Sequence, residues 1–190
     1  MNSEEKYKKF FTAGGKLSKD LIQLDGIEPK KIGFFEKRKL KKAKKYFELS
    51  SNESPGNAAP FLMLSKVSFS LGNQSESLSY LLKAWDLEPA NLILVIELSG
   101  VYGVLGKHKE AISVLEEGIK YYPKEPRVLF NLGLAYLLEN RAKEAVDIFR
   151  TTVDIEPEFK QNHSLLKYSM DVLSGKRPVP KTQSEIARYI

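Results

Sequence analysis

A chain of 190 residues with 42% hydrophobic content is long enough and apolar enough to bury a folded core. The absence of cysteine excludes disulfides, thiolate metal sites and thiol chemistry, and no apolar run approaches the length that spans a bilayer. Residues 1–50 carry a net charge of +7 against +6 for the whole chain, so the basic character belongs to the N-terminal quarter.

The N-terminal residues 1–23 are lysine-rich and lack the apolar core of a signal peptide, so we expect a basic leader and a cytoplasmic protein. A helix is expected around residues 16–24.

A repeat of constant period begins after this leader. Proline recurs at equal intervals, at Pro55, Pro89, Pro123 and Pro157. Small residues precede each proline by twelve positions, at Ala43, Ser77, Ala111 and Ala145. Bulky apolar residues precede it by eight, at Phe47, Leu81, Leu115 and Phe149. The interval between successive prolines predicts a solenoid of helix pairs, in which a unit cannot bury its apolar face alone.

Residues 126–159 carry the most complete version of the repeat, with Leu129, Leu132-Gly133, Tyr136, Ala145, Phe149 and Pro157. In this spacing the chain resembles the tetratricopeptide repeat family, whose pattern is W-x2-L-G-x2-Y, A-x3-F, P. Residues 92–125 and 58–91 match at fewer positions. Residues 24–57 form a degenerate repeat, because their first half holds Pro29 and has Lys30-Lys31 where Leu-Gly belongs. The resemblance implies an all-α fold, a right-handed solenoid of antiparallel helix pairs.

In chain order, the repeat predicts helices over residues 35–50, 58–71, 74–87, 91–105, 109–121, 127–139 and 142–155. A capping helix is expected over 160–173, where apolar and polar residues mix as the end of an array requires. A tail with two prolines, residues 174–190, follows as an extended linker and a short helix over 182–190. The repeat columns place Phe34 and Phe47 in the core.

The helix over residues 35–50 has an apolar seam and a cationic face, the basic face, formed by Lys37, Arg38, Lys39, Lys41, Lys42, Lys44 and Lys45. Such a face attracts nucleic acid, an acidic protein or an anionic membrane, or else it is simply the solvated outer side of the first repeat.

In tetratricopeptide arrays the first helix of each pair lines an inner groove, chiefly through positions two, five, nine and twelve of the unit. The resemblance implies a partner-binding surface formed here by Leu62, Lys66, Phe69, Ile93, Ile96, Arg127, Phe130, Asn131, Leu134 and Leu137. An apolar cluster of this size left in water marks an interaction site. It binds a partner segment, or it is covered by residues 1–23, by the tail residues 186–190, or by a second copy in a homodimer.

Some family members clamp a partner's C-terminal carboxylate with Lys, Asn and Arg. The matching positions here are Leu62, Lys66, Glu97, Arg127 and Asn131. Only the last two supply suitable donors and Glu97 repels a carboxylate, so we do not expect this clamp.

Catalytic patterns are missing from the sequence. Neither His108 nor His163 stands at the spacing of a triad or a metal site. Gly14-Gly15-Lys16 lacks the upstream glycine and the following Ser or Thr of a phosphate loop. We therefore expect no enzymatic activity, no metal and no cofactor.

The sequence predicts a non-catalytic scaffold or adaptor that binds an apolar or amphipathic protein segment, in one version as a small chaperone or assembly factor. The alternative is recruitment to nucleic acid or an anionic membrane through the basic face.

Overall fold

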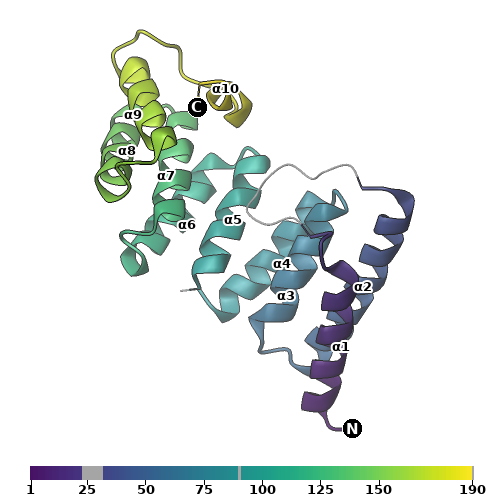
Figure 1. Cartoon of the computed structure of the whole chain (residues 1–190). Coiled ribbons are helices and arrows are strands. Elements are labelled where there is room, and N and C mark those ends of the chain that lie inside the picture. The colour runs from purple at the N-terminus through teal and green to yellow at the C-terminus, as the bar shows by residue number, and fades with distance from the viewer. Residues whose placement is uncertain (23–31, 90, 190) are drawn as a thin grey trace. The chain divides into compact units, whose positions relative to one another are not determined.

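The computed structural model describes residues 1–22, 32–89 and 91–189 (Figure 1). All regular secondary structure in these ranges is helical, with α1 at Ser3–Ser18, α2 at Phe34–Glu53, α3 at Ala58–Ser70, α4 at Gln74–Leu87, α5 at Leu92–Val104, α6 at His108–Tyr121, α7 at Pro126–Leu138, α8 at Ala142–Ile155, α9 at Lys160–Leu173 and α10 at Gln183–Ala187. The chain divides into two compact units, Met1–Leu105 (unit 1) and Gly106–Ile190 (unit 2). The helices predicted from the period and the capping helix are present, whereas the tail helix is shorter than the expected 182–190.

The turns within the helix pairs repeat the same local geometry. Gly72, Gly106 and Asn140 stand at the same position of successive repeats, and each has a positive φ, of 85°, 68° and 58°. A left-handed residue lets the chain reverse directly after a helix, and glycine and asparagine tolerate this conformation best. The reversal is closed by bonds from Asn73 N–H to the Ser68 carbonyl and from Arg141 N–H to the Tyr136 carbonyl, each 2.8 Å long.

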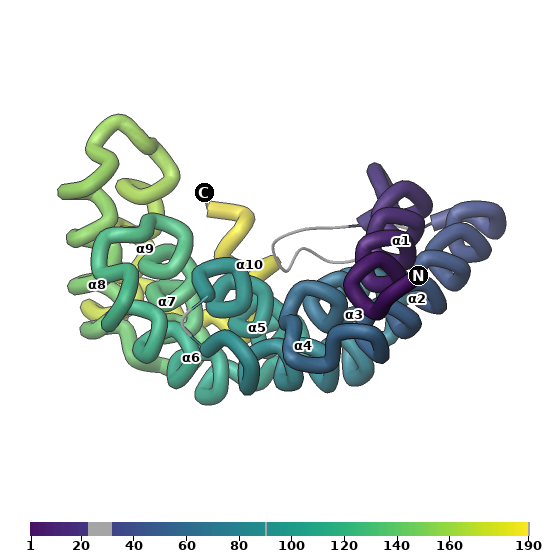
Figure 2. Tube along the Cα trace, turned by 90° about the horizontal axis from the view of Figure 1, so that it is seen from below, coloured from purple at the N-terminus to yellow at the C-terminus, as the bar shows by residue number. Residues whose placement is uncertain are grey.

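Unit 1 is a stack in which each helix from α1 to α5 packs against the next. Both views draw α1 alongside α2 (Figure 1 and Figure 2). The core between these helices and α3 contains Leu40, Phe47 and Leu64, all essentially inaccessible to water. Gly14 brings α1 close to α2, because a Cβ added there would lie 2.8 Å from the Phe47 ring.

Two predictions for the N-terminal quarter are wrong. A helix is expected over residues 16–24, but α1 ends at Ser18. Asp20, with a φ of 66°, has a left-handed backbone conformation that does not continue the helix. Phe34 is 75% exposed and does not belong to the core, because it is the first residue of α2 and lies before the apolar seam that starts at Leu40. Residues 24–31 of the expected repeat 24–57 lie outside the described residues.

Unit 2 stacks α6, α7, α8 and α9 in the same way. Gly133 of α7 lies directly over the buried ring of Phe149 in α8, where an added Cβ would approach ring atoms to 2.5 Å. Tyr136 donates a 2.7 Å hydrogen bond to Glu116, and burial together with this bond raises the pKa of Tyr136 to about 12. The tyrosine therefore stays protonated, and its hydrogen bond ties α7 to α6.

Candidate functional site

The inner positions of unit 1 lie on α3 and α5. Leu62, Lys66 and Phe69 follow each other at i, i+4 and i+7 and therefore share one face of α3. Leu62 is half-buried, whereas Lys66 and Phe69 are buried. On α5, Ile93 is 49% exposed and Ile96 is buried. Of these five predicted site residues, Ile93 and Leu62 are the two accessible to a partner.

A buried ion pair occupies the middle of this surface. The Lys66 ammonium lies 2.5 Å from a Glu97 carboxylate oxygen, and the two side chains are only 7% and 8% exposed. The pair joins α3 to α5 and engages the one lysine that the clamp positions offer in unit 1. Sequence reasoning considered Glu97 only as a repulsive group. The sequence signal for the pair was the opposite charge of Lys66 and Glu97 at the clamp positions of neighbouring repeats.

The inner positions of unit 2 lie on α7. Phe130, Leu134 and Leu137 again follow i, i+4 and i+7; Leu137 is fully buried and the other two are half-buried. Asn131 is also half-buried, and the exposed Arg127 side chain is bonded to Glu125 at 2.8 Å. An apolar strip with a partly exposed aromatic ring thus runs along α7.

The same register continues onto α9, where Tyr168 and Asp171 stand one period after Leu134 and Leu137. The tail, residues 174–189, folds back onto both side chains. Arg177 Nε lies 3.2 Å from an Asp171 carboxylate oxygen, and the Tyr189 ring centroid is 5.3 Å from that of Tyr168. Burial and the proximity of Tyr189 raise the pKa of Tyr168. In unit 2, inner positions are therefore in contact with the chain's own tail.

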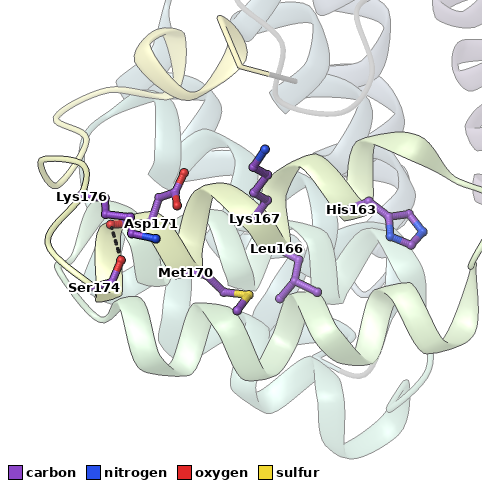
Figure 3. A pocket seen from close by; sticks show the side chains of 7 residues that line it. All are labelled: His163, Leu166, Lys167, Met170, Asp171, Ser174 and Lys176. Atoms are coloured by element: carbon purple, nitrogen blue, oxygen red, sulfur yellow. Dashed lines mark hydrogen bonds between the residues drawn. The ribbon is translucent and has the colours of Figure 1, made fainter.

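A pocket of about 340 Å³ opens beside α9 and the start of the tail. Its lining consists of His163, Leu166, Lys167, Met170, Asp171, Ser174 and Lys176. Figure 3 shows Leu166 and Met170 on one side of α9 and Lys167 and Asp171 on the other. Met170 is half exposed, as is Leu173 at the end of the helix. The capping helix therefore keeps an uncovered apolar edge next to the charged side that meets the tail.

The basic face of α2 is largely free of internal partners in the described structure. Its exposed members are Lys37, Arg38, Lys39, Lys41, Lys42 and Lys45. Lys44 differs, because it is half-buried and forms an ion pair with Glu76 of α4. Phe34 and Phe35 precede this face, 75% and 76% exposed, with their rings packed edge to face 5.7 Å apart. Sequence reasoning missed this exposed aromatic pair, because the repeat column assigned Phe34 to the core.

The residues that the sequence analysis weighed as catalytic or phosphate-binding groups lie within helices. His163, in the first turn of α9, lies with its Nε2 2.6 Å from the carbonyl oxygen of Pro157, which precedes the helix. Gly14-Gly15-Lys16 lies inside α1 and forms no loop. Among the described residues, no group of three or more His, Asp or Glu side chains is placed to hold a metal ion. In that part of the chain, too, no helix has the length and hydropathy needed to cross a membrane.

Comparison with known proteins supports the repeat assignment. Residues 105–167 match the tetratricopeptide repeat family. No curated protein sequence matches the chain. Similar solved structures include MamA 41-end from Desulfovibrio magneticus RS-1, with 17% identity over 97% of this chain and 90% of that one and a TM-score of 0.73.

Two shorter matches are described by what they bind. YrrB, described as a TPR protein with an unusual peptide-binding site, is 22% identical over 73% of this chain and 69% of its own, with a TM-score of 0.59. The first TPR of Spaghetti (RPAP3), bound to the HSP90 peptide SRMEEVD, is 19% identical over 62% of this chain and 94% of its own, with a TM-score of 0.58. Identities this low show a shared fold, and the predicted all-α solenoid is confirmed. The match to the tetratricopeptide repeat family itself covers residues 105–167, and the rest of the chain shares the fold of these structures.

Proposed function

We propose that this protein is a non-catalytic interaction module that binds an apolar or amphipathic segment of a partner protein at its inner helix positions. The observation that carries the proposal is the partial exposure of large apolar side chains at these positions, with Ile93 at 49% in unit 1 and Phe130 half-buried in unit 2. Apolar side chains held on a preformed helical surface bind a segment at a low ordering cost. The peptide-binding descriptions of YrrB and of the RPAP3 repeat support the same mode.

The ion pair of Lys66 and Glu97 defines the kind of segment that unit 1 accepts. Because Lys66 is neutralised by Glu97 at 2.5 Å, it offers little attraction to a terminal carboxylate. Selection in unit 1 then rests on the apolar contacts of Leu62 and Ile93. A small chaperone or assembly factor that shields apolar segments of a client is a concrete version of this function.

Glutamate at the accessible inner positions is expected to weaken partner binding without unfolding the chain. We expect Ile93→Glu together with Phe130→Glu to weaken binding at least tenfold, because a charge at each site must be desolvated against an apolar segment. Peptides selected from a phage-displayed library against the full-length protein serve as ligands, and fluorescence anisotropy gives their Kd. Ile96 is unsuitable for this test, because it is only 3% exposed and glutamate there would disturb the core.

Leu87→Glu is the matched control. Leu87 ends α4, the second helix of its pair, and is 38% exposed, so glutamate there adds the same charge away from the inner positions. Its Kd should stay within twofold of wild type. Selected peptides that bind the double variant as tightly as the wild type would contradict the proposal. A dimeric mass in light scattering that becomes monomeric in the double variant would assign the surface to a second copy.

We infer a second candidate function from α2, namely docking to an anionic membrane. Phe34 and Phe35 project beside six exposed basic side chains, and this combination is typical of interfacial helices, which insert aromatic rings while lysines meet lipid phosphates. The two rings pack on each other at 80°, and this arrangement favours a single apolar wedge over two separate platforms for stacked bases.

Neutralising Lys41, Lys42 and Lys45 to glutamine is expected to weaken binding to vesicles of 30% phosphatidylserine by about a hundredfold, since each lysine near such a surface contributes ~1 kcal/mol. Co-sedimentation at several salt concentrations measures the effect. Glutamine at Lys109, Lys124 and Lys143 is the control, because it removes the same charge from exposed positions in unit 2.

Phe34→Ala with Phe35→Ala separates the two kinds of anionic partner. The pair should weaken vesicle binding and leave any binding to single-stranded RNA unchanged. Vesicle binding that depends equally on both lysine sets, or RNA binding that depends on the phenylalanines, would overturn the membrane assignment.

A further inference from the structure

We propose that the C-terminal tail, residues 174–189, is a built-in ligand of the inner surface of unit 2, and that this surface takes partner segments of the same chemistry. That chemistry is an arginine followed by an aliphatic and an aromatic side chain. The inference rests on the proposed function and specifies both the occupant and the partner class for unit 2.

The register of the repeat identifies the surface under the tail. Inner positions nine and twelve of the last full repeat are Leu134 and Leu137, and one period later the same positions are Tyr168 and Asp171 of α9. Because α9 packs on α8 as α7 packs on α6 within unit 2, α9 continues the row of first helices. A segment that contacts Tyr168 and Asp171 therefore lies where a partner of the array binds.

Arg177 contacts this surface through several groups at once. Its backbone N–H donates to the Asp171 carbonyl at 3.1 Å, and its Nε lies 3.2 Å from the Asp171 carboxylate. Its guanidinium stands 5.4 Å from the Tyr168 ring centroid and 4.3 Å from that of Tyr189. A carboxylate and an aromatic face together make a site selective for arginine, because the planar cation both bonds and stacks.

Ile186 is the apolar anchor of the tail. It is 1% exposed and lies in α10, a helix of five residues. A helix this short is not stable alone in water, so its form depends on the surface beneath it. Tyr189 completes the contact through the ring pair with Tyr168. The tail thus folds on its site as a disordered partner segment does.

The connection to α9 favours the covered state. Pro178 and Pro180 stiffen the short link after Arg177, and this raises the effective concentration of α10 at its site. A partner then binds only the fraction of molecules whose tail is released, and its apparent affinity falls by that fraction. Release of the tail would make the surface available.

A synthetic peptide of residues 176–190 tests the proposal in the full-length chain. The variant Ile186→Asp with Tyr189→Ala removes both anchors of the attached tail. We expect the labelled wild-type peptide to bind this variant at least tenfold more tightly than wild-type protein, in which the site is filled. A peptide carrying the same two changes should not bind, and Asp171→Asn in the protein should weaken binding of the wild-type peptide.

Arg177→Ala with Tyr189→Ala is a second releasing variant. Both side chains are partly exposed, so their loss spares the core of unit 2. Circular dichroism and hydrogen exchange in α6–α9 verify folding. Equal peptide binding by wild type and both variants would overturn the proposal, as would an absence of binding to either folded variant.

The two hypotheses fail separately. If selected peptides depend on Ile93 and Phe130 while the tail peptide binds neither releasing variant, only the built-in ligand is refuted. If the tail peptide binds as expected while no selected peptide depends on those residues, the general partner-binding function is refuted.

Discussion

Gly133→Val is expected to lower the free energy of unfolding of unit 2 by about 3 kcal/mol, the upper part of the usual range for overpacking a core. An added Cβ would lie 2.5, 2.7 and 2.8 Å from three atoms of the Phe149 ring. That ring is fully buried, so it cannot swing out into solvent without disturbing the core. Replacing a helical glycine normally stabilises a helix by up to ~1 kcal/mol. The cost of the clash with the ring exceeds this gain.

Urea unfolding followed by far-ultraviolet circular dichroism measures this loss. Gly15→Ala is the matched control, because Gly15 also lies within a helix and an added Cβ there meets nothing within 4 Å. It should stabilise α1 by about 0.5–1 kcal/mol. Phe149→Leu combined with Gly133→Val should cost less than the sum of the two single changes. An unchanged unfolding midpoint for Gly133→Val would contradict the close approach of α7 and α8.

Glu97→Leu is expected to cost unit 1 about 3 kcal/mol, because it leaves the buried Lys66 ammonium without the carboxylate that neutralises it. Lys66 is 6% exposed and its nearest carboxylate is the Glu97 oxygen at 2.5 Å. A buried lysine without a counter-charge must lose its proton or move toward water, and either response disturbs the contact between α3 and α5.

The double variant Lys66→Met with Glu97→Leu should recover most of this loss, since replacing both members of a buried pair by apolar residues is often neutral. The protein has one tryptophan, Trp85 in α4, so its fluorescence reports on unit 1 during unfolding. Equal stability of Glu97→Leu and the double variant would contradict this explanation, because the loss would then not come from the unpaired Lys66 ammonium.

The period of the sequence predicts the helices from α3 to α9, because a proline, a left-handed turn residue and a small-to-large contact recur together in each repeat. It fails at the N-terminus for a specific reason. Gly133 contacts Phe149 sixteen positions later, whereas Gly14 makes the same contact with Phe47 thirty-three positions later. A search at fixed spacing therefore cannot recognise α1 as the helix that pairs with α2. It instead takes the residues just before Phe34 as the first helix of that pair.

The sequence predicts where the candidate site lies, but it does not predict which of its side chains are accessible to a partner. The repeat register indicates which side chains share an inner face, since this depends only on helical spacing. Burial depends on contacts between distant residues, such as Lys66 with Glu97 and Arg177 with Asp171. Such contacts have no local signature, so the sequence leaves open what covers each inner position.

The long connection between α1 and α2 has an energetic consequence. Residues 19–33 join these helices, whereas residues 71–73 suffice between α3 and α4. Bringing together the ends of a chain segment five times as long costs about 1.4 kcal/mol more in closure entropy. Two ring contacts join α1 to α2, between Phe11 and Phe47 and between Phe10 and Tyr46. Aromatic pairs contribute ~0.5–1.5 kcal/mol each beyond their buried area, so this packing offsets the entropy cost of bringing α1 and α2 together.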